Sequence, residues 1–515
     1  MARTRTGAST ETGTETGTET GTEASTEANT ATGPGLVSVA WRPVAAVGGS
    51  LTALLLALSG RYGYDADELY FRVAGQHLDW GYVDQPPLVP LLARLQIALF
   101  GDTVIAIRVI PALLAGLTVL LAALVARELG GARRAQVLAA VATAVSMFPT
   151  AVGHMLHTAT VDIPVWVAMS WLVIRILRTG EPRLWLVAGL VGGVGLLAKN
   201  LVVLLAIGLV GGILLAGPRR VLRGPHLWAG IGCAALVASP ALVWQAAHGW
   251  PQLEMAQQIG AIGSTATRVM FLPFQVILIG PLVTPLWVAG LLALFRWPRW
   301  RRYRALGVGF LIVAALVVLS AGKVHYAMGC LVTLVAAGCV PAARWTSGVL
   351  RRVALVAALA GNGVYTAVAG LPIIPESWLA RYPVLGIAQI TTKQIGWPEL
   401  AGQVGAVYRS LPPGERERAV LFGGTYAEAG ALARYGPENA LPPVYSGHNS
   451  LHAFARPADD KTVVIAVNVQ PGFTELFDRC EERGRFGLQN EPVLVCHDPK
   501  ERWSRLWPQL RHISA

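Results

Sequence analysis

The residues best suited to chemistry lie in one polar segment between two apolar runs. Asp67 and Glu68 are adjacent there, and Asp84 and Gln85 stand just before a Pro-Pro turn. A carboxylate within hydrogen-bonding distance of a substrate hydroxyl can remove its proton as a general base. The simplest alternative is that these carboxylates only keep a loop solvated. The aromatic residues among them, beginning at Tyr64, and the rigid turn favour a functional site.

A second set of polar residues interrupts the apolar runs that follow. Asp162 stands beside apolar neighbours, and an ionisable group at the mouth of a membrane span is costly and is usually kept for function. Lysines often lie at such positions because their stems reach the membrane interface. An ammonium group is also a good point-charge partner for a phosphate. Lys199 and Lys323 suggest a phosphate site, and His325 and Tyr326 lie with them at the outer ends of spans. Arg108 would either bind the phosphate as well or simply pair with a carboxylate of the loop.

Four histidines raise the question of a metal site. His154, His157, His248 and His325 lack the i, i+4 spacing of a helical zinc pair, and no cysteine cluster lies beside them. His154 and His157 are three residues apart, which allows them to share one helix face. A structural metal is the weaker interpretation of these residues.

The composition indicates the environment that positions these residues. Hydrophobic residues make up 53% of the 515-residue chain and charged residues 14%, against averages of about 45–50% and about 25% in soluble proteins. The apolar runs lie between residues 44 and 371, and a helix needs about 20 apolar residues to cross a membrane. We expect about eleven spans, at residues 44–60, 105–126, 134–152, 163–178, 184–198, 201–216, 226–245, 270–295, 305–321, 326–343 and 353–371.

The arginines predict the orientation of these spans. Short cytoplasmic loops collect Lys and Arg, and every second gap between the expected spans is rich in arginine, from Arg127 to Arg352. This alternation puts the N-terminus in the cytoplasm and the segment around Asp67 on the outer face of the plasma membrane. One bent helix at 184–216, where Lys199-Asn200 interrupts the run, would invert everything downstream. The basic gaps on both sides of that region favour two spans.

The two ends of the chain differ from its apolar middle, which we expect to form a transmembrane domain over residues 41–371. Residues 1–40 repeat Thr-Glu-Thr-Gly and are expected to be a disordered cytoplasmic tail. Residues 372–515 are expected to form a small soluble α/β domain outside the membrane. Its signals are β-like runs at 419–422, 463–469 and 492–495 and a helical stretch near 425–435.

The cysteines and the net charge bear on location and partners. Cys480 and Cys496 lie in the polar C-terminal segment, where a disulfide is permitted if that segment is outside the cell, and both the paired and the free states remain open. The formal net charge of +12 resides in short loops and not in a basic stripe with interleaved aromatic residues. Nucleic acid is therefore set aside as a partner, and the lipid bilayer is expected instead.

Several of these motifs resemble a known family. The run from Tyr64 to Phe71, the run Gly81-Tyr-Val-Asp-Gln-Pro-Pro-Leu88, Asp162 and the run Lys323-Val-His-Tyr326 are similar to those of the polyprenyl-phosphate-sugar-dependent glycosyltransferases. That group includes the protein O-mannosyltransferases of glycosyltransferase family 39 and the lipid A aminoarabinose transferases. The resemblance covers most of residues 44–371 and implies a GT-C fold. The stretches 423–436 and 445–449 resemble the outer domain of actinobacterial members.

The resemblance implies an inverting transfer of a sugar, mannose or a related hexose or pentose, from a polyprenyl-phosphate donor to an acceptor hydroxyl. Asp67 would be the general base and Glu68 would orient it or the acceptor, while Asp65 would be a solvated neighbour. Asp162 would hold the acceptor or share the role of base. The acceptor would be a protein, an envelope glycan or lipid, or an exported metabolite.

The same resemblance assigns the remaining polar residues to the substrates. The donor phosphate would be bound by Lys199, Lys323 and Arg108. The substrates would be positioned by Tyr64, Asp84, Gln85, His325 and Tyr326.

The chain departs from the family beside the Pro-Pro-Leu turn. The aminoarabinose transferases carry a lysine there, whereas this chain has Gln85, a neutral amide that cannot neutralise a lipid phosphate. Some members that bind a metal use an acid just before the turn. A divalent metal held by Asp84 and His248 is therefore a minor hypothesis, and no other cofactor is expected.

Two other classes of protein also place charges at the mouths of spans. A transporter or lipid flippase usually shows internal repeats and matched broken helices, and we find no such repeat in this sequence. A non-catalytic scaffold would leave the acidic cluster unexplained. We therefore expect an enzyme, with a transporter or flippase of the cell envelope as the alternative.

Overall fold

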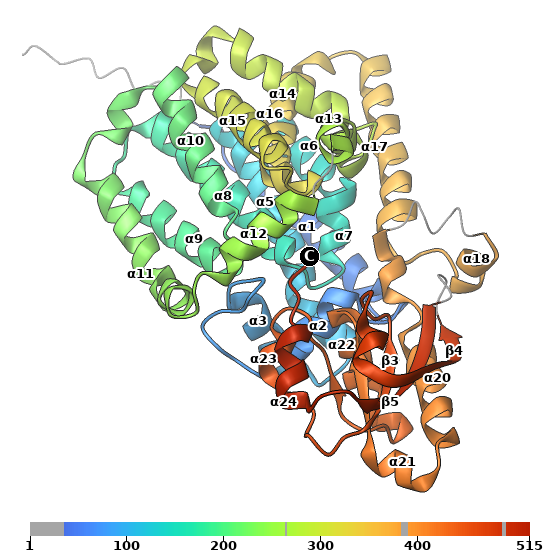
Figure 1. Cartoon of the computed structure of the whole chain (residues 1–515). Helices are drawn as coiled ribbons and strands as arrows, with labels where there is room; N and C mark the ends of the chain where they lie inside the picture. The colour runs from blue at the N-terminus through green and yellow to red at the C-terminus, as the bar shows by residue number, and fades with distance from the viewer. Residues whose placement is uncertain (1–35, 263–264, 383–389, 487–490, 515) are drawn as a thin grey trace, which may run out of the picture. The chain divides into compact units, whose positions relative to one another are not determined.

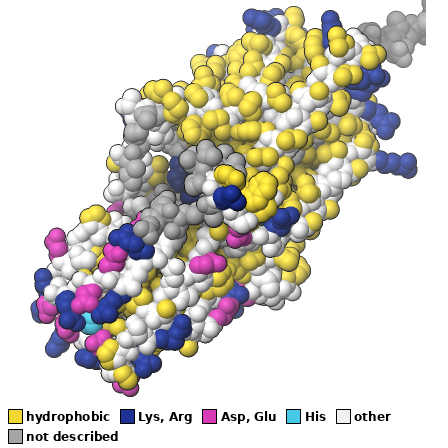
Figure 2. Space-filling view, turned by 90° about the vertical axis from the view of Figure 1, so that its right-hand side faces the viewer, with side chains coloured by type: hydrophobic (Ala, Val, Ile, Leu, Met, Phe, Trp, Pro, Cys, Tyr) yellow, Lys and Arg dark blue, Asp and Glu magenta, His cyan; other side chains and the backbone are white. Residues whose placement is uncertain are grey.

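The structure is a computed structural model that describes residues 36–262, 265–382, 390–486 and 491–514. Most of the expected N-terminal tail, residues 1–35, lies outside these described residues. From Val37 onward, apolar helices form one part of the chain and a small sheet with its own helices forms another (Figure 1). Hydrophobic side chains cover the helical part, and charged side chains gather over the other (Figure 2).

Seven helical segments among the described residues are long and apolar enough to cross a membrane, so the chain is a multi-pass membrane protein, as predicted. Four are the single helices α1 (Trp41–Leu58), α8 (Thr158–Thr179), α11 (Pro225–Ala247) and α17 (Val349–Gly370). The other three each join a short helix to a long one: α4 (Val104–Ile107) with α5 (Val109–Glu128), η2 (Pro298–Tyr303) with α15 (Arg304–Leu319), and η3 (Val324–Ala327) with α16 (Met328–Trp345).

Two further segments are broken helices. The first consists of α6 (Arg133–Ala144) and α7 (Met147–Gly153), bent by 66°, and the second of α13 (Thr265–Ile279) and α14 (Thr284–Arg296), bent by 113°. Two more apolar helices, α9 (Leu184–Ala198) and α10 (Val202–Ala216), have 15 residues each, or about 22 Å of length against a bilayer core of about 30 Å. The eleven expected spans coincide with these helices. The count of eleven is not confirmed, because length and composition give seven spans in the described part of the chain, or nine with the broken pairs.

One buried side chain hydrogen-bonds to backbone groups at both helix breaks. Asn362 of α17 accepts hydrogen bonds from the N–H groups of Leu282 and Val283 at 3.1 and 3.3 Å. Its Nδ2 donates to the carbonyl oxygens of Val145 at 2.7 Å and Ile279 at 3.4 Å. In lipid, a backbone group released by a helix break must find its partner within the protein. Asn362 supplies that partner at both breaks.

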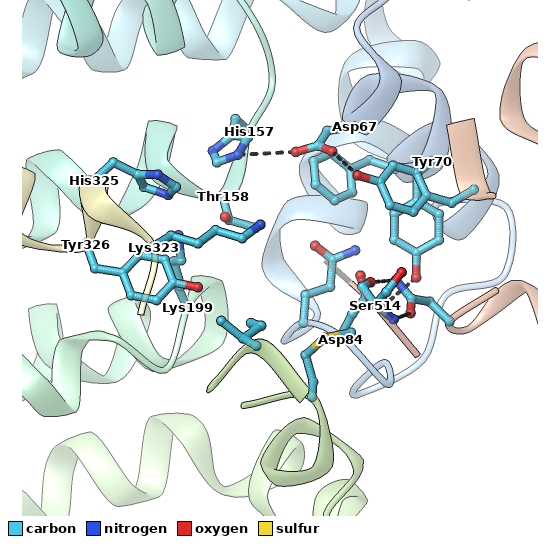
Figure 3. A pocket seen from close by; sticks show the side chains of 16 residues that line it. Asp67, Tyr70, Asp84, His157, Thr158, Lys199, Lys323, His325, Tyr326 and Ser514 are labelled. Atoms are coloured by element: carbon cyan, nitrogen blue, oxygen red, sulfur yellow. Dashed lines mark hydrogen bonds and ion pairs between the residues drawn. The ribbon is translucent and has the colours of Figure 1, made fainter. Parts of the chain in front are cut away.

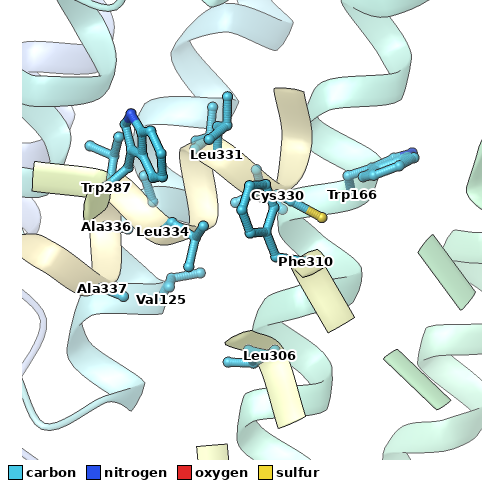
Figure 4. Packing of buried hydrophobic residues seen from close by; sticks show 14 of the residues in the cluster. Val125, Trp166, Trp287, Leu306, Phe310, Cys330, Leu331, Leu334, Ala336 and Ala337 are labelled. Carbon is cyan, nitrogen blue, oxygen red and sulfur yellow. The ribbon is translucent and has the colours of Figure 1, made fainter. Parts of the chain in front are cut away.

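The core of the helical part is packed around α16. Every residue from Met328 to Val340 is buried, as expected for a helix that other helices surround. Trp166 of α8 lies so close that a Cβ atom at Gly329 would be 2.3 Å from the Trp166 Cβ, so only glycine fits there. Phe310 of α15 belongs to the same cluster (Figure 4).

Short helices connect the spans. The polar segment after α1 contains α2 (Ala66–Ala74) and α3 (Leu88–Phe100). Further along, η1 (Arg219–Leu222) precedes α11 and α12 (Pro251–Ile262) follows it. The C-terminal part adds α18 (Glu376–Arg381), η4 (Ile390–Gln394), α21 (Pro413–Arg418), η5 (Pro437–Asn439), α23 (Leu451–Phe454) and η6 (Phe473–Leu476).

The C-terminal part also contains the predicted small α/β domain. Its sheet has the order β2-β1-β3-β5-β4. The strands are β1 (Ala419–Gly423), β2 (Val444–Tyr445), β3 (Val463–Val467), β4 (Phe477–Phe486) and β5 (Glu491–Pro499). β1 is parallel to β2 and β3, whereas β5 is antiparallel to β3 and β4. The expected β-like runs lie on β1, β3 and β5, and the expected helical stretch coincides with α22 (Tyr426–Tyr435).

Two layers of side chains cover this sheet. Leu421 and Ile465 share a cluster with α20 (Trp397–Ser410) and α22, whereas Val420 and Val464 pack with α24 (Trp503–Leu506) and η7 (Trp507–Leu510). This alternation is what a sheet covered on both faces requires. Cys480 of β4 and Cys496 of β5 stand opposite each other and form a disulfide, which resolves the alternative left open above.

A buried ion pair holds the polar segment in place. Arg108 Nε and Nη2 donate to Glu68 Oε1 and Oε2 at 3.0 and 2.8 Å, and both side chains are fully buried. The guanidinium also donates to the carbonyl oxygens of Ser59 and Gly63, each at 2.7 Å. Glu68 Oε1 accepts a further hydrogen bond from the N–H of Leu156 at 3.0 Å. The pair thus joins α2 to the end of α1, the start of α5 and the loop after α7.

The small domain contacts the polar segment directly. α2 packs against α22, and a Cβ atom at Gly430 would lie 2.9 Å from the carbonyl carbon of Leu69. Val83 N–H also donates to Ser450 Oγ at 2.9 Å. These contacts fix the small domain against the polar segment that contains α2 and Asp67.

We predict that Arg108→Ala lowers the free energy of unfolding by about 3–5 kcal/mol, because it leaves Glu68 as an unpaired buried charge. Thermal unfolding of the purified protein in detergent measures the change. The exposed Arg134 provides the matched control, Arg134→Ala. Equal stability of the two variants would contradict the structural role of the pair.

Candidate active site

The first turn of α2 sets the direction of the candidate carboxylates. Asp65 caps this helix: its side chain accepts a hydrogen bond from Asp67 N–H at 3.1 Å, and Glu68 Oε2 accepts one from Asp65 N–H at 2.7 Å. Burial, together with the charges of Asp67 and Glu68, raises the pKa of Asp65 to about 7. The expectation that Asp65 is a solvated neighbour is wrong, because this side chain is a buried helix cap.

Asp67 points into a cavity, where two groups hold its oxygens (Figure 3). Its Oδ1 accepts a hydrogen bond from the Tyr426 hydroxyl at 3.0 Å, and its Oδ2 lies 3.2 Å from His157 Nε2. Ala159 N–H donates to His157 Nδ1 at 2.9 Å, so the ring proton is on Nε2. Burial lowers the pKa of His157 to about 4. The neutral imidazole therefore donates a hydrogen bond to Asp67 Oδ2 at pH 7.

The cavity has a volume of about 130 Å³ and two chemically different sides. Figure 3 shows Lys199 and Lys323 on one side and Asp67 with Ser514 on the other. Seven of the residues predicted from sequence line this cavity: Asp67, Asp84, Gln85, Lys199, Lys323, His325 and Tyr326.

The two lysines form the cationic side of the cavity. Lys199 Nζ lies 5.0 Å from the centre of the Tyr326 ring. Burial lowers the pKa of Lys199 to about 8, opposed by the attraction of Asp162, and burial also lowers the pKa of Lys323. Among the described residues, neither ammonium group has a carboxylate at ion-pair distance. The cavity thus presents two positive charges to whatever occupies it.

Asp84 and Gln85 enter the cavity from the Pro-Pro turn. Asp84 Oδ1 accepts a hydrogen bond from the Tyr70 hydroxyl at 2.6 Å, and burial raises the Asp84 pKa to about 6. Gln85 is buried, and its Nε2 has no hydrogen-bond partner in the described protein. An unpartnered buried donor of this kind is a ready contact for an oxygen of a bound molecule.

Asp162 and Tyr64 do not line the cavity. Asp162 is buried on α8, where it attracts the ammonium group of Lys199 and has one oxygen, Oδ1, without a hydrogen-bond partner in the described protein. Tyr64 is buried elsewhere, and its hydroxyl donates to Asp102 Oδ1 at 3.3 Å.

Arg108 and Glu68 are also absent from the cavity lining. The expectation that Arg108 binds the donor phosphate does not agree with its position, because its side chain has no exposed surface and is committed to Glu68 and to backbone carbonyl groups. Glu68 orients Asp67 only through the backbone, as a member of the helix cap.

The metal hypothesis does not fit the donor set found here. His248 stacks on Trp244 with ring centres 4.0 Å apart, and its Nδ1 lies 2.8 Å from the Trp244 carbonyl oxygen. Asp84 is bonded to Tyr70. Within the described residues, no group of three or more His, Cys, Asp or Glu side chains could hold a metal ion. We therefore assign no chemical step to a metal.

Sequence analysis missed the two residues that hold Asp67. His157 was considered only as a metal ligand, although its position three residues before Thr160 is that of a helix cap. Tyr426 is 359 residues from Asp67, and no local pattern reveals such a contact. Ser514, near the end of the chain, reaches the same cavity, where its hydroxyl oxygen lies 2.9 Å from His448 Nε2.

Comparisons with known proteins give the family and the fold that the chain resembles. The family model for dolichyl-phosphate-mannose-protein mannosyltransferases matches residues 84–244. No curated protein matches the chain at a significant level.

Solved structures share the fold. ArnT from Cupriavidus metallidurans has a TM-score of 0.58 in the apo state at 16% identity, covering 88% of this chain and 97% of ArnT. The same protein bound to undecaprenyl phosphate gives 0.57 at 17% identity, with the same coverage. The mycobacterial arabinofuranosyltransferase AftD gives 0.52 at 15% identity, covering 91% of this chain and 41% of AftD. The chain is thus similar to the polyprenyl-phosphate-sugar-dependent glycosyltransferases, in sequence over residues 84–244 and in fold over most of its length. It has their GT-C fold, as its motifs predicted.

Proposed function

We propose that the chain is an inverting glycosyltransferase that moves a sugar from a polyprenyl-phosphate donor to an acceptor hydroxyl. The observation that carries this proposal is the single cavity in which a carboxylate, Asp67, faces two lysines, Lys199 and Lys323. A base on one side and cations on the other are what a transfer with phosphate as the leaving group requires. The family match and the fold support the same reaction class.

Asp67 is the proposed general base. Its carboxylate takes the proton of the acceptor hydroxyl as the acceptor oxygen bonds to the anomeric carbon of the sugar. The neutral His157 keeps Oδ2 in place by its hydrogen bond, which fixes the direction of the carboxylate. Attack from the side opposite the leaving group inverts the anomeric centre.

Lys199 and Lys323 are the proposed partners of the departing phosphate. The bond from the anomeric carbon to the phosphate oxygen breaks with its electron pair on that oxygen, and the two ammonium groups stabilise the added charge. Gln85 Nε2, which has no partner in the described protein, adds a hydrogen-bond donor at the position where the aminoarabinose transferases carry a lysine. Asp162 supports Lys199 by attracting its ammonium group. His325 and Tyr326 line the donor side.

The outer face of the plasma membrane is the proposed location of this site. The alternation of basic loops puts the small domain outside and the N-terminus in the cytoplasm. The Cys480–Cys496 disulfide supports that placement, because disulfides persist in oxidising compartments.

Mannose is the sugar favoured by the description of the family model. A pentose is the second candidate, because AftD is an arabinofuranosyltransferase of the same fold. Neither the family match nor the fold favours a transporter or flippase.

Asp67→Asn should reduce sugar transfer about 10²–10⁴-fold, because the amide cannot accept the acceptor proton. Transfer of radiolabel from polyprenyl-phosphate mannose and polyprenyl-phosphate arabinose, measured with membranes and with purified protein, tests this. The exposed Asp460 supplies the control variant Asp460→Asn. Unchanged transfer by well-folded Asp67→Asn protein would refute the assignment of the base.

Lys323→Gln should weaken donor binding about tenfold or more, because a charge-assisted contact to phosphate contributes about 1.5–3 kcal/mol. The dissociation constant for polyprenyl phosphate in detergent is the measurement. Lys500→Gln, at an exposed lysine of the small domain, should leave this constant unchanged. A normal donor affinity in Lys323→Gln would place the phosphate elsewhere.

The donor affinity should also fall as the pH rises from about 7 to about 9, because Lys199 loses its charge above a pKa of about 8, earlier than an ordinary lysine. Lys323, Asp162 and Asp67 are the other charged groups that act on it. Lys199→Arg keeps its charge throughout this range. The dissociation constant of the Lys199→Arg variant for polyprenyl phosphate should be nearly independent of pH. If this constant rose equally steeply with pH in the variant and in the natural protein, Lys199 would be excluded as the titrating group.

A further inference from the structure

A second cavity lies beside the first, between α2 and the small domain. Its volume is about 480 Å³, and it shares Tyr426 and Ser514 with the cavity that contains Asp67. Its other walls come from Ala66, from the residues just before α20, and from the loops after β1 and β3. No role for this space follows from the transfer reaction alone.

The two volumes point to different occupants. Sites for small molecules usually measure about 300–1,000 Å³. The cavity around Asp67, at about 130 Å³, is below that range and already presents its lysines to a phosphate, whereas the second cavity falls within the range. The second cavity therefore has the space for another substrate that the first lacks.

Tyr426 stands between the two cavities, and its position shows how a hydroxyl of a molecule in the second cavity would reach Asp67 in the first. Tyr426 lines both cavities, and its hydroxyl lies 3.0 Å from Asp67 Oδ1. Its ring stacks on His448, its N–H donates to His448 Nδ1 at 2.9 Å, and His448 in turn contacts Ser514. The Tyr426 oxygen thus occupies a position from which a hydroxyl can give its proton to Asp67.

The lining of the second cavity suits a sugar. The indole of Trp397 and the ring of Phe486 are aromatic surfaces of the kind that pack on the C–H face of a pyranose or furanose ring. Glu428 is buried, with Oε1 accepting from Asn468 Nδ2 at 2.9 Å and Oε2 bonded to the Thr425 hydroxyl. Lys393 adds a cation to this set. A mixture of hydrogen-bond donors and acceptors beside aromatic rings matches a polyhydroxylated ligand better than a fatty acyl chain.

We propose that this second cavity is the acceptor site and that the acceptor is a saccharide, whose reacting hydroxyl takes the place of the Tyr426 hydroxyl at Asp67. This inference rests on the proposed glycosyl transfer and names its acceptor class. The Tyr426 hydroxyl lies where the reacting hydroxyl of the acceptor binds, and it turns aside when the acceptor sugar enters.

Photolabelling tests the site without requiring catalysis. Diazirine derivatives of methyl mannoside, glucoside, galactoside and arabinofuranoside are irradiated with the full-length protein, and the labelled peptides are identified by mass spectrometry. Labels should fall on the segments around Trp397, Thr425 and Asn468, in both the natural protein and Asp67→Asn. Labelling of this site in the natural protein, combined with no sugar transfer by the natural protein, would refute the proposed function and leave the saccharide site standing. Labelling that is absent, or confined to the apolar helices, would overturn the acceptor site.

Kinetics with the unmodified methyl glycosides as acceptors provide the second test. Trp397→Leu and Lys393→Gln should raise the acceptor KM about tenfold, a loss of about 1.4 kcal/mol of binding, with the dissociation constant for polyprenyl phosphate unchanged. Trp378→Leu, at an exposed tryptophan of α18, is the matched control. Tyr426→Phe should lower the acceptor KM, because it removes the competing hydroxyl. Transfer to a Ser- and Thr-containing peptide but to none of the glycosides would overturn the saccharide assignment.

Discussion

Arg108 and Glu68 face each other without solvent contact, and the position of Asp67 depends on where they lie. The guanidinium bonds to the backbone at the end of α1, and the carboxylate bonds to the loop after α7 and to the cap of α2. A buried charge is tolerated only when it is paired and fully hydrogen-bonded. This requirement fixes the first turn of α2, and with it the direction in which Asp67 leaves the helix. The pair does not line the cavity, and it influences the cavity only by fixing the backbone of α2, which carries Asp67.

The positions of the helices could be predicted because the bilayer imposes one length and one composition on every span. The breaks are less predictable: the run at 134–152 contains Pro149 and the run at 270–295 contains Gly280-Pro281, but the hydrogen-bond partner that both bends share is Asn362 in another helix. In the small domain, β1, β3 and β5 carry a β-like signal. β4 was not predicted, because it is exposed and highly charged, and its pairing with β5 comes from the chain around it.

The chemical types in the site could be read from sequence, but their partners could not. Asp67, Lys199 and Lys323 line one cavity. Arg108 has the same charge as the two lysines, and only its burial separates its role from theirs. His157 and Tyr426 come from distant segments and define the environment of Asp67. The types of functional groups could thus be predicted from the sequence, whereas the contacts between them became visible only in the folded structure.

Asn362 has a consequence for how the helical part can move. One amide group bonds to the backbone at the break between α6 and α7 and at the break between α13 and α14. If the break between α6 and α7 moved and the amide turned with it, the N–H group of Leu282 at the other break would lose the hydrogen bond that Asn362 gives it. Transporters rely on two such bundles rocking against each other. Here a single side chain bonds to the backbone at both breaks, which opposes independent movement of the two broken helices.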